Sequence, residues 1–365
     1  MSSCSINEEA NPAFESPTEY GASSKTIGSA ARSALPKDLE FWSTIYERDM
    51  YVQTWKTVAN LVLNREGFTL WDHFDECNQV VKGLPKPSGY SFLGPNNPDP
   101  GLMLTYWGLS TGLSHAVRGD DGRDYIVTLV TVGEEGHEHL RTLRRLSFSV
   151  DPLLSNNHIL PIIKEITYED LTFVVVPKAM YKVQEGLHQR FKNSVEDVVY
   201  MLIQAVEAII DIHQHRIAHR DLFLDNFIVD WFPESMIARK SVVRPRVYLI
   251  DFETAIDMSD PEQLCRGLPF PDDKYFRPRA PELSTPEEPY CPFSLDIWQF
   301  GTSVLKHFPS SGIPEIDAIW PTLVSENSQD RPTAKEVMDK LNEVVRSIRP
   351  SDLHLSVKDT YLTDI

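Results

Sequence analysis

Cysteine is scarce in this sequence, and its few copies stand alone. Only four of the 365 residues are cysteine, at Cys4, Cys77, Cys265 and Cys291, and none of them forms a CxxC pair. A structural zinc site or a disulfide framework requires closely spaced cysteines. Both are therefore disfavoured, and we expect reduced thiols inside the cell.

Positive charge and long apolar runs are also lacking. The chain carries 35 Lys and Arg against 53 Asp and Glu, a formal net charge of -18, which opposes contact with nucleic acid or an anionic membrane. No apolar run approaches the roughly 20 residues of a bilayer span, and the N-terminus "MSSCSINEEANPAFESP" lacks a basic start followed by an apolar stretch. We expect a cytoplasmic protein, with the nucleus left open, that binds neither nucleic acid nor membrane.

Composition shifts along the chain predict its domain organisation. Residues 1–35, rich in Ser, Ala, Glu, Pro and Gly without periodicity, are typical of a disordered leader. Residues 36–101 begin with apolar residues at helical spacing and end in a cluster of Pro, Gly and Asn, which predicts a helical N-terminal extension and a linker. We expect a small β-rich region at 102–180, a mainly helical region at 181–348 and a tail at 349–365, which gives an α+β fold class.

The expected β-rich region contains three stretches of β-branched and apolar residues: "DYIVTLVTVG", "HILPIIKEITYE" and "LTFVVVPKAM". They favour a small antiparallel sheet. An Asp-Gly pair in "RGDDGRD" predicts a hairpin turn, and "GHEHLRTLRRLSF" predicts a helix that interrupts the strands.

The expected helical region begins with "SVEDVVYMLIQAVEAIIDIHQH", where Ser194 and Asp197 have the spacing of a capping box. Two further helices are predicted in "SLDIWQFGTSVLKHF" and "TAKEVMDKLNEVVRSI". In the second of these, Thr333 and Glu336 again have capping-box spacing.

A polar loop follows the first of these helices, in "IAHRDLFLDNFIVD". Asp221 and Asn226 lie five residues apart in it, between a predicted helix and a predicted strand. In such a loop an Asp can accept the proton of an attacking hydroxyl while an Asn holds a metal bound to a phosphate. The next strand, in "VYLIDFETA", ends at Asp251, a hard oxygen ligand suited to Mg²⁺.

Three further motifs follow in order: "RAPELS" with Glu282, "SLDIWQFG" with Asp296, and "SQDRPTA" with Arg331. This succession over roughly residues 105–348 resembles the eukaryotic protein kinase superfamily and, within it, a divergent group of fungal kinase-like proteins. The resemblance implies a bilobal fold with a small β-rich N-lobe and a larger helical C-lobe. It also implies a buried salt bridge between Glu282 and Arg331, and bracing of the polar loop by Asp296.

The resemblance further implies ATP and Mg²⁺ as cofactors, and a protein Ser/Thr substrate or a protein partner. Arg220 would link the polar loop to the segment that follows Asp251. The implied catalytic residues are Asp221, Arg220 and His219; the implied cofactor-binding residues are Gly112, Thr128, Asn226 and Asp251, of which Asn226 and Asp251 would hold the metal.

The sequence departs from the family where the phosphates would bind. "LSTGLSHAV" offers only Gly112 where the family has three glycines, with Ser110 and His115 at the flanking places. Thr128 stands where the family has its phosphate-binding Lys. Glu138 is nearest to the place of the Glu that would pair with that Lys, but it is out of register. The glycine-rich turn and the phosphate cation are therefore both expected to be defective.

Three more departures surround the polar loop. Phe223 stands where Ser/Thr kinases have a Lys, Tyr275 where they have a Thr, and Glu253 replaces the glycine after Asp251 and Phe252. The Glu adds negative charge and removes a residue that tolerates positive φ. Arg118 and Lys164 are candidates for a displaced cation that restores activity.

Two functions follow from this mixture. The chain is either an ATP- and Mg²⁺-dependent protein Ser/Thr kinase whose turnover is very slow or lost, or a pseudokinase that serves as a protein-binding scaffold. A small-molecule kinase of related fold is a third interpretation, which "RAPELS" and Arg331 disfavour because they resemble the protein-substrate branch.

The segment from Asp251 to Glu282 has no Ser or Thr after Ser259, so the usual switch by phosphorylation has no acceptor there. Asp272 and Asp273 lie in it instead. Two interpretations stay open: one of these carboxylates neutralises Arg220 and orders the segment, or both are solvated in a mobile loop.

Overall fold

The computed structural model of the chain describes residues 32–44, 48–73, 78–83, 85–86, 104–108, 112–147, 157–179, 181–186, 193–229, 246–260, 263–285, 287–308 and 310–355. Contacts divide the chain into two units, Met1–Leu35 and Pro36–Ile365. Only residues 32–35 of the first unit are described, so the expected disordered leader otherwise lies outside the described residues. The predicted tail at 349–365 begins with a short helix, and its residues 356–365 also lie outside.

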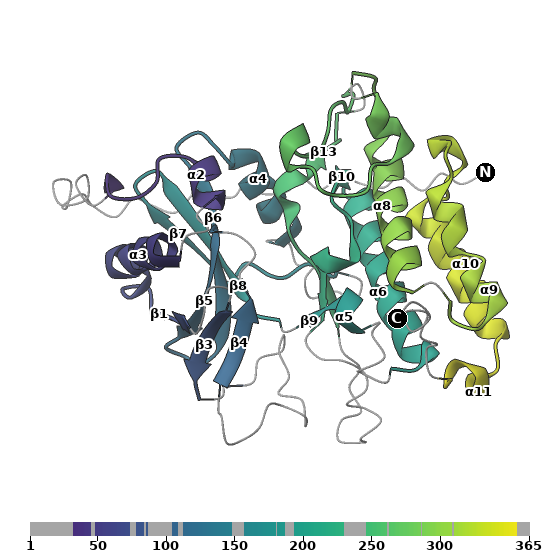
Figure 1. Cartoon of the computed structure of the whole chain (residues 1–365), viewed down its shortest axis with the longest axis horizontal. Coiled ribbons are helices and arrows are strands. Elements are labelled where there is room, and N and C mark those ends of the chain that lie inside the picture. The colour runs from purple at the N-terminus through teal and green to yellow at the C-terminus, as the bar shows by residue number, and fades with distance from the viewer. Residues whose placement is uncertain are drawn as a thin grey trace, which may run out of the picture. The chain divides into compact units, whose positions relative to one another are not determined.

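A five-stranded antiparallel sheet forms the centre of the sheet region, by which we mean the described residues from Pro36 to Ala179 (Figure 1). The order of its strands is β1-β5-β6-β8-β7. The three stretches predicted as strands are confirmed, and so is the hairpin turn between β5 and β6, where Gly122 has a φ of +80°. The strands are β1 (Phe68–Leu70), β5 (Ser114–Gly119), β6 (Asp124–Val132), β7 (Lys164–Tyr168) and β8 (Leu171–Pro177).

The sheet begins earlier in the chain than the sequence indicates. β1 pairs with β5, and a second sheet of three strands has the order β2-β3-β4. Residues 36–101, expected to be a helical extension and a linker, therefore contain strands as well as helices. Strands this short show no clear alternation, and the partner of β1 lies far along the chain. The second sheet consists of β2 (Asp72–His73), β3 (Asn78–Lys82) and β4 (Leu104–Gly108).

An aromatic layer covers one face of the five-stranded sheet. The ring of Trp55 lies 5.3 Å from that of His115 and 6.2 Å from that of Phe173, and its indole N–H donates to the carbonyl of Gly112 at 3.0 Å. The N-terminal helical segment is therefore docked on the sheet. That segment consists of α2 (Leu39–Ser43), α3 (Arg48–Val58) and a π-helical turn η1 (Ala59–Leu63).

The opposite face of the sheet carries α4 (His137–Ser147), the predicted interrupting helix. Leu140 of α4 packs in a cluster with Val174, whose neighbour Phe173 contacts α3 on the other face, because successive strand residues point to opposite sides. At the end of α4, Arg145 donates to Asp257 and to the carbonyl of His215. The helix is thus tied to residues far along the chain.

The helical region, by which we mean the described residues from Tyr181 to Leu355, packs around α6 (Val195–Gln214), α8 (Pro292–His307) and α10 (Ala334–Ser347). Both predicted capping boxes are confirmed, at the starts of α6 and α10. Gly301 lets α8 pack closely against η8 (Trp320–Val324), because a Cβ at this position would lie 2.5 Å from the Cβ of Leu323.

Short elements connect these helices. The order β12-β11-β9 forms one small sheet, and β10 pairs with β13. Within the described part of the chain, no helix has the length and apolar character needed to cross a membrane. The connecting elements are β9 (Tyr181–Lys182), α5 (Val183–Gly186), β10 (Ile217–Ala218), η4 (Leu224–Asn226), β11 (Phe227–Val229), β12 (Val247–Leu249), η5 (Phe252–Thr254), β13 (Ile256–Asp257), η6 (Asp272–Lys274), η7 (Pro281–Ser284), α9 (Pro314–Asp317), η8 (Trp320–Val324), η9 (Ser328–Asp330) and α11 (Pro350–Leu353).

Candidate functional site

A buried carboxylate of α8 fixes the polar loop between β10 and β11. Asp296 is fully buried and accepts hydrogen bonds from the backbone N–H groups of His219 at 2.9 Å and Arg220 at 2.7 Å. Its third contact is the ring of His213 at 2.9 Å. The expected bracing of the loop by Asp296 is confirmed.

Two further side chains of α8 continue this support. Gln299 accepts from the N–H of Leu222 at 2.9 Å and donates to the carbonyl of Arg220 at 2.7 Å. Ser303 accepts from the N–H of Leu224 at 3.0 Å. The sequence interpretation missed both residues, although they lie three and seven residues after the bracing Asp, on the same face of a helix.

Two residues of the site have a left-handed backbone that is unfavourable for a side chain. Arg220 has a φ of 66° and Asp251 a φ of 70°, and neither is glycine. Each such residue costs about 1–3 kcal/mol and persists only where the surroundings impose it. Strain of this kind gathers at functional sites, and here it sets the direction of two predicted site residues.

Asp221 and Asn226 are brought together as the sequence predicts. The side-chain amide of Asn226 donates to the carboxylate of Asp221 and to its backbone carbonyl, both at 2.8 Å. Both residues are buried. Because the amide nitrogen is occupied by these two bonds, it is the amide oxygen of Asn226 that stays able to act as a metal ligand.

An unpredicted arginine covers the carboxylate of Asp221. Arg277, in the segment between η6 and η7, donates to the two oxygens of Asp221 at 2.9 Å and 2.8 Å and to Asp225 at 2.7 Å. Its guanidinium lies 4.8 Å from the ring centre of Phe223. Burial alone would lower the pKa of Arg277, but the bonds and charges of Asp221 and Asp225 outweigh it and raise that pKa above its ordinary value.

His219 links the polar loop to the strand that ends at Asp251. It is fully buried, one ring nitrogen bonds to the carbonyl of Ile250 at 2.9 Å, and the other accepts from the N–H of Asp221 at 3.3 Å. Its own carbonyl accepts from the hydroxyl of Thr254 at 2.8 Å. With both ring nitrogens engaged, the side chain positions the two segments relative to each other.

The carboxyl group of Asp251 lies among other charges. Burial raises its pKa, and the negative charges of Asp221 and Asp225 raise it further, while His219 and Arg277 act in the opposite direction. The residue is nevertheless reached by solvent. A cation from solvent could therefore reach this carboxyl group, and the neighbouring His219 and Arg277 compensate its negative charge only in part.

Glu253, two residues later, is a second acid of the site with a raised pKa. Burial, followed by the charges of Asp251 and Asp221, raises the pKa of Glu253 to about 8. Ionisation of Glu253, and with it the negative charge that the sequence suggests at this place, is therefore disfavoured by its surroundings. Like Asp251, the residue is solvent-accessible.

Thr128, at the place of the expected phosphate cation, is engaged with another hydroxyl. Its Oγ1 lies 2.8 Å from the Oγ of Ser114 across the β5–β6 pair. Glu138, the nearest candidate for a partner from α4, is exposed and pairs with Arg141 of its own helix. This place in the sheet thus holds a neutral hydroxyl pair.

The two cations considered as replacements are both committed elsewhere. Arg118 makes a two-pronged ion pair with Asp124 at 2.8 Å and 3.0 Å. Lys164 pairs with Glu66 at 2.5 Å and lies over the ring of Phe68. Neither contact involves a residue of the polar loop.

Gly112, the candidate for a glycine-rich turn, directly precedes β5. Its carbonyl accepts the indole N–H of Trp55, so it is held under α3. His115, at the expected flanking place, is 1% exposed and stacks on Tyr51 at 5.6 Å. Its role is packing, because alternation along β5 turns it towards the aromatic layer. Ser110, at the other flanking place, lies outside the described residues.

Asp272 and Asp273 do not pair with Arg220 to hold the segment from Asp251 to Glu282. Within the described residues, Arg220 bonds to the carbonyl of Gly267 at 3.3 Å and to the hydroxyl of Tyr290 at 3.1 Å, and has no contact with Asp272 or Asp273. Asp272 pairs with Arg279 instead. The proposed neutralisation of Arg220 by these carboxylates is wrong, because neutral acceptors satisfy its guanidinium.

The end of this segment is fixed to the turn between η9 and α10 by the predicted salt bridge. Arg331 donates to both oxygens of Glu282, at 2.6 Å and 2.8 Å, and to the carbonyls of Ser294 and Ser325. The Arg331 side chain is fully buried. The expected pairing is confirmed.

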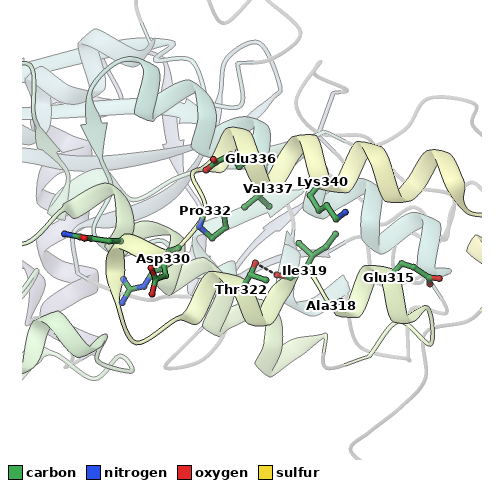
Figure 2. A pocket seen from close by; sticks show the side chains of 11 residues that line it. Glu315, Ala318, Ile319, Thr322, Asp330, Pro332, Glu336, Val337 and Lys340 are labelled. Carbon is green, nitrogen blue, oxygen red and sulfur yellow. Dashed lines mark hydrogen bonds between the residues drawn. The ribbon is translucent and has the colours of Figure 1, made fainter.

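A separate groove of about 560 Å³ lies between η8 and α10 (Figure 2). Apolar side chains such as Ile319 and Val337 share its lining with charged ones, and the hydroxyl of Thr322 donates to the carbonyl of Ile319 at 2.6 Å. None of the predicted site residues lines it. The lining residues are Glu315, Ala318, Ile319, Thr322, Gln329, Asp330, Arg331, Pro332, Glu336, Val337 and Lys340.

No group of three or more His, Cys, Asp or Glu side chains with metal-binding geometry occurs among the described residues. The donor set at Asn226 and Asp251 is instead one amide and one carboxylate. These are hard oxygen ligands, as Mg²⁺ prefers, and Mg²⁺ commonly completes its coordination with water and phosphate oxygens.

Comparison with known proteins gives one informative match. The chain is 24% identical over 171 residues to a protein of Acanthamoeba polyphaga mimivirus named "Putative serine/threonine-protein kinase". The match covers 40% of this chain and 56% of the viral protein, so the chain spans little more than half of its relative. No family model matches the chain. The match supports a kinase-like chain, and the finer assignment to a fungal group has no support.

Proposed function

We propose that the chain is a bilobal, protein-kinase-like phosphotransferase that transfers the terminal phosphate of Mg²⁺-bound ATP to a Ser or Thr hydroxyl of a protein, at a low rate. The observation that carries this proposal is the loop of Asp221 and Asn226. Its backbone is held by Asp296, Gln299 and Ser303, all from one helix face. The likeness to the viral protein agrees with it.

The proposed roles follow from the contacts of each residue. Asn226 and Asp251 would hold Mg²⁺ through the amide oxygen and the carboxylate. The ion, when bound, neutralises charge that develops on the phosphates. The fit is favourable because burial and, after it, the charges of Asp221 and Asp225 raise the pKa of Asp251, so a cation there would relieve the repulsion among these carboxylates. Arg220 and His219 are positioning residues in this proposal.

Asp221 would orient the attacking hydroxyl and receive its proton. The bond between the hydroxyl oxygen and the terminal phosphorus forms while the bond from that phosphorus to the oxygen of ADP breaks. The proton passes to the Asp221 carboxylate, and ADP leaves. The carboxylate must be uncovered for this step, since Arg277 occupies both of its oxygens.

The low rate follows from the neutral pair of Thr128 and Ser114. A unit charge about 4 Å from a phosphate contributes about 4 kcal/mol at an effective dielectric constant of about 20, so the loss of one Lys slows transfer about a thousandfold. Gly112, packed under Trp55, offers no replacement.

A second candidate function is a pseudokinase that binds a protein partner without turnover. The observation that favours it is the covered carboxylate of Asp221, whose side chain is only 5% exposed beneath Arg277. This candidate predicts a folded protein in which nucleotide, if it binds at all, is not consumed.

Thermal unfolding with ATP, with and without Mg²⁺, tests the proposed binding site. Nucleotide at about 100 times its Kd stabilises the folded protein by about 2.7 kcal/mol, which raises Tm by about 5–10 °C in a protein of this size. Asp251→Asn should abolish the part of this shift that depends on Mg²⁺. An unchanged shift in that variant would place the metal elsewhere.

Transfer of radiolabelled phosphate to protein substrates separates the two candidate functions. Slow transfer by the wild type that is abolished in Asp221→Asn supports the phosphotransferase. Nucleotide binding without any transfer favours the pseudokinase. A rate of about 1–100 per second, usual for kinases, would contradict the proposed low rate.

A further inference from the structure

Among the residues that the structure describes, Arg277 is the only cation that forms an ion pair with the polar loop. Its guanidinium contacts two carboxylates, Asp221 and Asp225, and one aromatic ring, that of Phe223. The residue belongs to the coil between η6 and η7, so no helix or strand fixes its backbone. Its side chain is 29% exposed, against 5% for that of Asp221. The guanidinium is therefore the outer, solvent-reached member of the pair.

This arrangement blocks the proposed base. A substrate hydroxyl cannot approach the Asp221 carboxylate while the two nitrogens of Arg277 lie within 2.9 Å of its oxygens. Asn226 occupies a further acceptor position on one of these oxygens. Phosphotransfer therefore requires that the guanidinium leave Asp221 and bind another acceptor.

We propose that Arg277 is the residue that binds the terminal phosphate in this site. The inference rests on the proposed function, because it assumes that a nucleoside triphosphate enters beside Asp221. The guanidinium then shifts from the carboxylate of Asp221 to the oxygens of the terminal phosphate. One displacement supplies the missing phosphate cation and uncovers the base.

The chemistry of the three contacts supports such a shift. A guanidinium presents the same pair of parallel N–H donors to a phosphate as to a carboxylate, and the phosphate carries more charge. Asp225, held by a different nitrogen of Arg277, can keep its bond as a pivot. The face of Phe223 supports the guanidinium plane during the movement.

Other described cations near the sheet are less suited to this role. Arg118 is held by Asp124 through two bonds, and Lys164 by Glu66. Lys178 is 4% exposed, and burial lowers its pKa to about 8. Within the part of the chain that the structure describes, none of them forms a hydrogen bond or an ion pair with the polar loop, whereas Arg277 already lies against the base.

Binding of ADP and of a non-hydrolysable ATP analogue, both with Mg²⁺, tests the inference without any need for turnover. Arg277→Gln should weaken binding of the analogue about tenfold and leave ADP binding within about twofold, because only the analogue carries the terminal phosphate. The matched control is Arg279→Gln, which removes the same charge two residues later, from an exposed pair with Asp272. Its analogue-to-ADP ratio should equal that of the wild type.

A second pair of variants guards against misfolding, since Arg277→Gln leaves the buried Asp221 without its partner. Asp221→Asn and Asp221→Asn/Arg277→Gln differ only in the arginine, and neither leaves a buried carboxylate at position 221 without its partner, while Asp225 loses its ion pair in the double variant. The same tenfold loss for the analogue should separate them. An analogue-to-ADP ratio that is equal in the two would overturn the role of Arg277 while leaving nucleotide binding intact.

The failure of the proposed function has a different signature. If the wild type binds neither ADP nor the analogue in the presence of Mg²⁺, the nucleotide site itself is refuted, and the inference falls with it. If the wild type binds both and discriminates between them through Arg277, both proposals are supported. Equal weakening of ADP and analogue in Arg277→Gln would also overturn the inference, since it would show that the residue acts on the whole site.

Discussion

The helical region and the sheet region contribute to the candidate site in opposite ways. In the helical region, Asp296, Gln299 and Ser303 are all used to hold the backbone of the polar loop. In the sheet region, Thr128 offers only a hydroxyl, which bonds to Ser114. In the proposed function, the first region fixes the geometry of the reacting groups, and the second lacks a charge that would stabilise the phosphates.

This difference shows that positioning and charge stabilisation are separable properties of one site. Hydrogen bonds from a rigid helix can keep a loop in place whether or not a phosphate is bound. A phosphate cation has no such independent structural role, and it can be supplied from another segment. Arg277 is positioned for this purpose by Asp221 and Asp225 rather than by the sheet.

The largest expected effect comes from the support of the loop. Asp296→Ala should lower the free energy of unfolding by about 3–5 kcal/mol, because two buried backbone N–H groups and the ring of His213 lose their acceptor. Urea unfolding measures it. The counterpart in the sheet region, Thr128→Val, should cost only about 1 kcal/mol. Equal costs would remove the contrast between the two regions.

The aromatic layer on the sheet should affect stability and leave the site unchanged. Trp55→Phe loses the indole N–H bond to Gly112 and some buried volume, which should cost about 2 kcal/mol of unfolding free energy. The shift of Tm caused by Mg²⁺ and ATP should stay the same. A folded variant that has lost this shift would show that the outer face takes part in nucleotide binding.

Restoring the charge in the sheet should sharpen the contrast. Thr128→Lys should raise the rate of phosphate transfer about tenfold, which corresponds to 1.36 kcal/mol. This is only part of the estimated loss, because Ser114 crowds the site and the carboxylate of α4, Glu138, is exposed and paired with Arg141. Labelled-phosphate transfer measures it, with Asp221→Asn added as the background control. If this variant binds nucleotide and transfers no faster than the wild type, the missing Lys does not limit the reaction.

Local patterns in the sequence were sufficient for much of this architecture. Capping-box spacing identifies the starts of α6 and α10, and β-branched runs identify β6, β7 and β8. The bracing by Asp296 and the pair of Glu282 with Arg331 came from motif order. Such features depend on a few neighbouring residues or on an ordered set of motifs, and both are visible in a single chain.

The proposed role of Arg277 as a replacement cation could not be predicted in this way. Arg277 lies 56 residues from Asp221, in a coil without periodicity. Arg118 and Lys164, which the sequence offered as candidates for a displaced cation, each pair with a carboxylate of their own. Which ion pairs form is decided by tertiary proximity, and spacing along the chain carries no information about it.

The effect most specific to the charge of the site is the pH dependence due to Glu253. Burial and the neighbouring carboxylates raise its pKa from 4.5 to about 8, so the folded protein keeps a proton that the unfolded chain has already released. The stability due to this group is present in full below about pH 4.5 and is lost as the pH rises through about 8. Stability of the wild type should therefore fall over this range, and that of Glu253→Gln should fall less.

Urea midpoints of both proteins at several pH values between about 5 and about 8 measure this difference. Glu336→Gln is the matched control, because bonds from the backbone and hydroxyl of Thr333 lower the pKa of Glu336, so that its contribution has the opposite sign and appears above pH 4.5. Mg²⁺ should restore part of the loss in the wild type near pH 8 by favouring the ionised acids, but not in Asp251→Asn. Parallel pH profiles for the wild type and Glu253→Gln would show that the carboxyl groups of this site do not share the proposed repulsion.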